Sequence, residues 1–464
     1  MKRFAKMLCV IVLSLIVLCA CDGKTQEVTE TRPPWNGYEG TSLHYVYYYE
    51  SGRALKWEED VIFLADNYLD DFGALTPYDI CIETPEKTVY NNELYDPELR
   101  EQFLAEINAL IPKLEDMTDT QILFELQRIV AQLNDLHTYV VIPEEHYYPI
   151  NFEILYADQK PLLYATILPE KYEEGILGYL YSVNDVPIDK VVAKLTPYIS
   201  HENKQSLMHS VCQEVCNPDI LHTIGILEDE DDPVKYTLIS WDHRFVDVTL
   251  DPVTDKKIQW MDFEGYSLAE AYPFMYKDHD TKNFWYEYLP EDEMFYVRIN
   301  QFEYMNGYGI MNLGNDILKE TRELGGVHKL VIDLRYNPGG YQGYGYDQFI
   351  TVLERVEADD IYVLINESTY SNGVITASLI KTAIPEAILV GTPAGQSPNF
   401  YASVFNEDYV MPNCGVEFRL PQAYWRTMAG YEYDALMPDI AIYPTLQHYM
   451  YSTDYILEVV RNRP

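Results

Sequence analysis

Residues 328–340 read HKLVIDLRYNPGG, and this stretch decides the fold class. Its apolar run has the composition of a buried strand, and the Asn337-Pro338-Gly339-Gly340 turn that follows is typical of a tight loop. The same alternation continues on both sides, with further strands expected at 294–299, 361–366 and 387–390 and helices at 308–324, 342–356 and 372–382. Strands and helices that alternate at this spacing predict an α/β domain with a mostly parallel sheet.

Two loops that follow these strands carry groups suited to acyl transfer, and in such sheets the loops at the strands' carboxyl ends form the site. The first turn lets the backbone approach a ligand, because Gly339 and Gly340 lack a Cβ, and leaves amide N–H groups to face an oxyanion. The second loop carries Ser368 and Ser371 before an expected helix, whose N-terminal amides favour developing negative charge. A serine here also serves commonly as a helix N-cap, so spacing alone leaves both roles open.

Four phrases in this region, VIDLRYNPGG, VLINESTYSNGVITASLI, ILVGTPAG and MPDI, resemble a known family in order and spacing. They are similar to the catalytic domain of the serine peptidases that include tail-specific (C-terminal processing) protease and tricorn protease. The resemblance covers residues 294–464, with a weaker similarity at 120–200. It implies a ClpP/crotonase-like spiral α/β catalytic domain that needs no cofactor and acts on protein or peptide substrates. In that family the second serine of the turn is the nucleophile, a position that Ser371 takes.

The resemblance also implies how this serine is activated. Residues 391–397 read GTPAGQS and lack the lysine that C-terminal processing peptidases use there. Tricorn-like members use a histidine from the helical N-terminal part and a glutamate shortly before Pro-Asp. Here His137, in NDLHT, and Glu432, in EYDALMPD, match those positions.

The chemistry implied is that of a triad. Neutral His137 would take the proton of Ser371 and return it to the leaving amine, and Glu432 would orient the imidazole. The oxyanion hole would come from the N–H of Gly339 or Gly340 together with that of Asn372. A histidine that caps a helix end is the alternative for His137. No CxxC pair, HExxH motif or EF-hand loop occurs, so no metal site is expected.

The resemblance and the local patterns divide the chain into five parts. They are a signal peptide (1–20), a tether (21–40), an N-terminal helical subdomain (41–145), a PDZ-like and β-rich α+β middle region (146–290) and the catalytic domain (291–464). Helical periodicity predicts helices at 57–72, 97–114 and 120–133 in the N-terminal helical subdomain. Residues 176–195 read as strand, turn, strand and helix, and resemble half of a PDZ module; a generic hairpin and helix is the alternative.

The N-terminus has the features of an export signal. Lys2, Arg3 and Lys6 precede an apolar run that is short for a membrane span. The run ends in Leu18-Cys19-Ala20-Cys21, which resembles the lipobox of bacterial lipoproteins and implies lipidation of Cys21. We therefore expect an extracytoplasmic protein anchored to a bacterial membrane by its lipid, with an ordinary cleaved signal peptide as the alternative.

The charge composition limits the classes of partner that the chain is expected to bind. The chain has 33 Lys+Arg and 74 Asp+Glu, so its formal net charge is 33 − 74 = −41. Such a surface repels phosphate backbones, which excludes nucleic acid as an expected partner. Cys212 and Cys216 are compatible with a disulfide or with two buried thiols. Two functions remain open: a serine peptidase, or a catalytically inactive peptide-binding lipoprotein on a peptidase scaffold.

Overall fold

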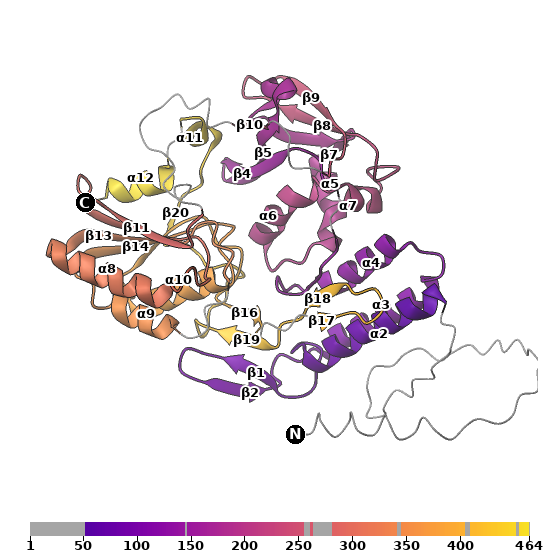
Figure 1. Ribbon diagram of the computed structural model, residues 1–464, viewed down its shortest axis with the longest axis horizontal. Coiled ribbons are helices and arrows are strands. Elements are labelled where there is room, and N and C mark those ends of the chain that lie inside the picture. The colour runs from indigo at the N-terminus through magenta and orange to yellow at the C-terminus, as the bar shows by residue number, and fades with distance from the viewer. Residues whose placement is uncertain are drawn as a thin grey trace, which may run out of the picture. The chain divides into compact units, whose positions relative to one another are not determined.

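The computed structural model describes residues 52–143, 146–254, 260–262, 281–340, 345–403, 409–451 and 454–463 (Figure 1). These residues belong to one compact unit. The expected signal peptide, Cys21 and a tyrosine-rich segment at 43–49 lie outside the described residues. Of the helices described, none has the length and apolar character needed to span a membrane.

A six-stranded sheet forms the centre of the C-terminal part. Its order is β11 (Phe284–Leu289), β12 (Met294–Ile299), β13 (Val327–Asp333), β14 (Ala358–Ile365), β15 (Ile388–Gly391) and β20 (Ile440–Ala441). The strands from β12 to β20 run parallel, and only the edge strand β11 is antiparallel to its neighbour. The predicted α/β fold with a mostly parallel sheet is therefore confirmed.

Helices cover both faces of this sheet, because its strands are apolar on both sides. One face packs against α8 (Ile310–Leu324), α9 (Tyr346–Leu353) and α10 (Asn372–Ala383), and the other against α12 (Tyr455–Arg461) (Figure 1). Alternation along β13 explains the division: Leu330 and Ile332 join the core under α8 to α10, whereas Val331 joins the core under α12. A short helix, α11 (Leu446–Met450), precedes α12.

A buried ion network fixes the end of β13. Arg335 pairs with Asp333 and, at 2.7 Å, with Asp454 at the start of α12, and Arg298 of β12 reaches Asp333 at 3.1 Å. Burial would raise the pKa of Asp333, but the two guanidinium groups outweigh it and lower that pKa. Asp333 and Arg335 thus have a structural role at the end of β13, where they connect it to β12 and α12.

The N-terminal part is helical, as predicted. It contains α2 (Arg53–Asp71), α3 (Pro97–Leu110) and α4 (Asp119–Ala131). A capping box between Thr118 and Gln121 begins α4, whose apolar stripe is buried. The chain leaves α4 at Gln132 and reaches His137 five residues later, beyond the helix end. His137 is therefore not a helix-capping residue of α4.

The middle region is a seven-stranded antiparallel sheet with three α-helices. Its strands are β4 (Asn151–Ala157), β5 (Lys160–Pro169), β6 (Tyr179–Val183), β7 (Val186–Pro187), β8 (Val234–Ile239), β9 (Phe245–Leu250) and β10 (Trp260–Asp262), and its helices are α5 (Ile188–Leu195), α6 (Lys204–Glu214) and α7 (Pro218–Thr223). The turn predicted within residues 176–195 is present at Asn184-Asp185, and both residues have positive φ, as a tight hairpin requires. Cys212 and Cys216 are free thiols, so they form no disulfide.

Two small sheets join segments that are far apart in the sequence. The first has the order β16 (Asn399–Ala402), β19 (Ala423–Arg426), β1 (Ile80–Glu83) and β2 (Thr88–Asn91), and the second β17 (Tyr409–Val410), β18 (Glu417–Arg419) and β3 (Tyr139–Val140). β1 pairs in parallel with β19, and β3 pairs with β18. These pairings tie the helical part to the C-terminal part on both sides of His137.

Candidate active site

Ser371 is the residue immediately before α10, and its backbone is strained. Its φ of 52° and ψ of −127° lie in a region that non-glycine residues rarely adopt. The side chain makes no capping hydrogen bond to α10. Instead its Oγ lies 3.1 Å from Nε2 of His137. The N-cap alternative thus does not describe Ser371, whose hydroxyl is within reach of a base.

His137 has the setting of a neutral base. Its ring stacks on Phe400 of β16, with ring centroids 5.6 Å apart and planes 7° apart. Burial lowers the pKa of His137 to about 4, against a smaller raising effect of the Tyr401 backbone. The ring is therefore unprotonated near neutral pH, and Nε2 can accept the Ser371 proton if Nδ1 carries the ring hydrogen.

The glycine turn after β13 lies against the serine. A Cβ built on Gly339 would be 2.5 Å from Cβ of Ser371 and 2.9 Å from its Oγ, and Gly339 has φ +92°. Any side chain at this position would collide with the serine turn, so glycine is required both for space and for conformation.

The hydrogen bonds of the backbone amides distinguish the two glycines that the sequence offered as oxyanion donors. The N–H of Gly339 donates to Oδ1 of Asn337 at 2.8 Å, so it is not free to bind an oxyanion. In the described part of the chain, no acceptor is bonded to the N–H of Gly340 or Asn372. Asn372 is the first residue of α10, where amides are unpaired by geometry. These two amides are the donors available for an oxyanion.

The site opens into a cavity of about 1210 Å³. Ser371, His137, Gly340 and Asn372 line it, and so does His209 of α6. A cavity of this size is large for a small metabolite and has room for several residues of a peptide.

A second serine and histidine pair lies in the same region. Ser368 Oγ is 2.9 Å from Nδ1 of His209, and Ser368 is only 5% exposed. Ser368 lies in the turn after β14, three residues before Ser371, and its own N–H donates to Asn366. Because α10 begins after Ser371, the free helix amide adjoins Ser371 and not Ser368. The geometry therefore favours Ser371 as the nucleophile.

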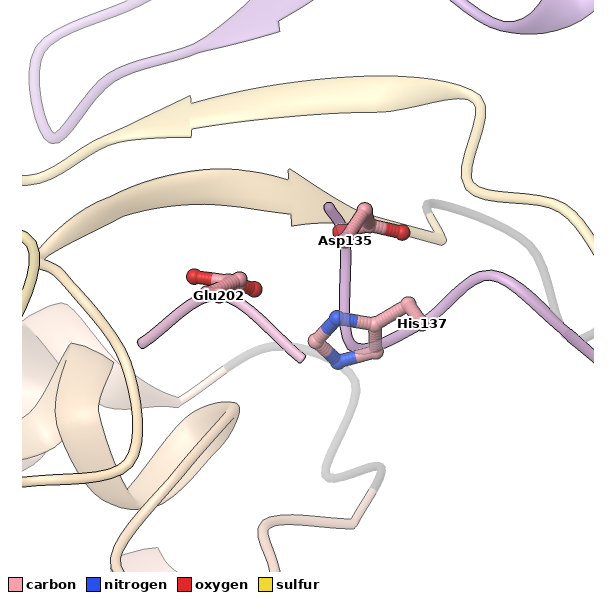
Figure 2. A group of neighbouring side chains, drawn as sticks. All are labelled: Asp135, His137 and Glu202. Carbon is pink, nitrogen blue, oxygen red and sulfur yellow. The ribbon is translucent and has the colours of Figure 1, made fainter. Parts of the chain in front are cut away.

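Glu432 does not join the histidine. Its side chain is exposed, and in the part of the chain that the structure describes no hydrogen bond connects it to His137 or Ser371. The third-member role expected for Glu432 has no support in this geometry. The carboxyls of Asp135 and Glu202 are the ones that face the ring: one oxygen of each and a ring nitrogen of His137 lie within 4.8 Å of one another (Figure 2). The same three side chains are the set of donors in the described residues that could hold a metal ion.

Gln396 connects the nucleophile turn to this group. Its Oε1 accepts the N–H of Ser371, and its Nε2 donates to Oε1 of Glu202. Gln396 belongs to the GTPAGQS stretch at 391–397. The missing lysine in this stretch is the sequence feature that draws attention to Gln396. Glu202 had no such signal, because its position depends on Asn203, which begins α6 and donates to the carbonyl of Ala394 at 3.1 Å.

Comparison with known proteins finds the same fold elsewhere. The structure of mature CPAF complexed with lactacystin matches with a TM-score of 0.58 and 14% sequence identity, covering 89% of this chain and 98% of that one. The crystal structure of mature CPAF matches with a TM-score of 0.58 and 13% identity, covering 89% and 97%. The tricorn protease gives a TM-score of 0.37 with 12% identity over 88% of this chain and 36% of that one, too low to support an argument.

The sequence itself matches no family model and no curated protein. The mixed α/β fold expected from the sequence motifs is present, whereas the ClpP/crotonase-like spiral and the PDZ-like module stay predictions. The chain has the fold of CPAF.

Proposed function

We propose that this chain is a serine-type peptidase that hydrolyses peptide bonds of proteins or peptides through an acyl-enzyme on Ser371. The observation that carries the proposal is the 3.1 Å approach of Ser371 Oγ to Nε2 of His137, beside the unpaired N–H of Asn372. The peptidase fold supports it, although a fold alone does not fix a function.

The reaction begins when Ser371 Oγ attacks the carbonyl carbon of the scissile bond and its proton passes to Nε2 of His137. The negative charge on the carbonyl oxygen faces the N–H groups of Asn372 and Gly340. His137 then gives its proton to the leaving amine, and the acyl-enzyme remains. A water molecule, deprotonated by His137, releases the acid product and restores Ser371.

The middle region is proposed to hold the substrate. Residues 179–195 form a hairpin followed by α5, the arrangement that suggested a PDZ-like module. Such modules bind a peptide as an added strand and hold its terminal carboxylate with backbone amides. Such binding would favour cleavage of substrates near their C-termini.

A catalytically inactive peptide-binding protein is the second candidate. The exposed position of Glu432 and the lack of a hydrogen bond to Nδ1 of His137 within the described structure favour it. It would use the same cavity to bind peptides without cleaving them.

Incubation of the purified chain with denatured casein separates these two functions. The peptidase is expected to generate new peptide termini, detected by mass spectrometry, and to release the first product in a burst if hydrolysis of the acyl-enzyme is slow. Intact casein after prolonged incubation, with casein peptides bound to the protein, would contradict the peptidase and favour the binding protein.

The location of the protein is also a proposal. We expect an exported protein held on a bacterial membrane by lipid on Cys21. Growth of expressing cells with an alkyne analogue of palmitate is expected to label the full chain and not a Cys21→Ala variant. An unlabelled, released wild-type protein would instead indicate an ordinary cleaved signal peptide.

A further inference from the structure

Two carboxyl groups lie beside the His137 ring, those of Asp135 and Glu202, and within the described structure neither forms an ion pair with a lysine or arginine. Asp135 is 1% exposed, and Glu202 is partly buried. Neither is paired with a lysine or arginine in the described residues. Two carboxylates this close, removed from water and without a counter-ion, cannot both remain ionised at neutral pH.

Hydrogen bonds hold both carboxyls in place. Asp135 accepts from the hydroxyl of Thr138 at 2.6 Å through Oδ2, and Glu202 accepts from Gln396 and, at 3.4 Å, from the N–H of Leu136. The other oxygen of Asp135, Oδ1, is buried and makes no hydrogen bond to the described residues, and the same is true of Nδ1 of His137. Two polar atoms are thus left unpaired on facing groups.

Figure 2 shows a ring nitrogen of His137 directed toward both carboxyls. Because Nε2 faces Ser371, the nitrogen on this side is Nδ1. A proton on Nδ1 would make Nε2 the acceptor that Ser371 needs, and a negative charge beside Nδ1 would stabilise the imidazolium that forms after proton transfer.

We infer that Asp135 and Glu202 hold one proton between them, and that their single remaining negative charge orients His137 and stabilises its protonated form. The inference rests on the proposed function, since the ring must act as a base for this charge to matter. It assigns to a pair of positioning residues the role that the sequence assigned to Glu432.

The surroundings are consistent with a single shared charge. Burial raises the pKa of Asp135 and of Glu202, and Asp135 raises that of Glu202 further. The other titratable groups that sense these carboxyls are the phenols of Tyr68, Tyr401 and Tyr424, whose pKa values are raised, so they are neutral at pH 7. The carboxyl pair is therefore the source of negative charge beside the ring.

The test uses amides, which have the shape of a protonated carboxyl. In Asp135→Asn or Glu202→Gln the remaining carboxyl can ionise without a like-charged neighbour, so one negative charge is kept. Each single variant is expected to retain kcat/KM within about tenfold, whereas the double variant is expected to lose roughly 10³- to 10⁴-fold in kcat with little change in KM. The step of the acid limb that protonates the carboxyl is expected to stay near its wild-type position in each single variant, because in both cases one carboxylate gains a proton beside a neutral neighbour, and it is expected to be missing from the double variant.

Asp60→Asn provides a matched control. Asp60 is also 1% exposed and accepts backbone N–H groups, but it lies in α2 and bonds to Asn413 and Cys414. Its replacement is expected to change stability and leave the pH profile unchanged, as a structural role predicts.

Several results would overturn the inference. A folded double variant with activity within tenfold of wild type would do so, and so would one single variant as inactive as the double, because one residue alone would then carry the charge. Loss of wild-type activity in EDTA, restored by Zn²⁺, would show that the group binds a metal ion instead. If the wild-type protein cleaves nothing, NMR of the His137 ring still decides: the Nδ1 hydrogen should be present in the wild type and in both single variants, and lost in the double variant.

Discussion

Replacement of Ser371 by alanine is expected to lower kcat by roughly 10⁶-fold, to the residual level that substrate binding and the oxyanion donors support. The reason is that Ser371 Oγ is the atom that forms the acyl bond, and among the described residues it is the side-chain hydroxyl that lies within hydrogen-bond distance of His137. Peptide binding should be nearly unchanged, because the substitution removes one oxygen. Casein cleavage rates and the affinity for an uncleaved peptide measure the two effects separately.

Ser368→Ala is the matched control for this variant. Ser368 lies three residues away, also within hydrogen-bond distance of a histidine, and is equally small. Its loss should cost less than about tenfold in activity, the size of one net hydrogen bond. Full inactivation of Ser368→Ala together with retained activity of Ser371→Ala would instead identify Ser368, with His209 as its base, as the nucleophile.

Replacement of His137 by alanine has the second large expected effect, again roughly 10⁶-fold in kcat, because serine is a poor nucleophile without a base. The partly buried ring also packs on Phe400, so some loss of stability is expected as well. A thermal melt shows whether the variant is folded, and only the activity of folded protein enters the comparison.

His209→Ala tests whether the loss of activity is specific to His137. Like His137, His209 lines the cavity and contacts a serine hydroxyl, and burial lowers its pKa. Its loss removes a contact of Ser368 and leaves the Ser371 pair intact, so most of the activity should remain. Equal inactivation by the two histidine variants would mean that the cavity as a whole, and not one base, had been disrupted.

The parts of the fold that could be predicted from the sequence are those encoded locally. The strands and helices from 294 to 391 follow from long apolar runs, periodicity and glycine turns, and the structure matches them within a few residues. β1 and β19 could not be predicted, since each is four residues long and they pair across some 340 residues of sequence. Short strands gain their stability from partners that no local pattern identifies.

In the candidate active site, too, the residues that could be predicted are those marked by local sequence. Ser371 and His137 were found because each lies in a recognisable phrase next to a strand or helix end. The sequence did not show that the Gly339 N–H is occupied. This depends on the rotamer of Asn337, whose Oδ1 accepts the N–H of the residue two positions later. Glu202 was missed because α6 and the loop at 394–396 place it, and these segments meet only in the folded protein.

The most direct test of the account is the site of reaction with a fluorophosphonate, which bonds covalently to an activated serine. The wild-type protein should gain one phosphonyl group, mapped by peptide mass spectrometry to Ser371, and His137→Ala should gain none. A modified Ser368, or no modification at a reagent concentration that labels an active serine peptidase in the same tube, would contradict Ser371 and His137 as a nucleophile and its base.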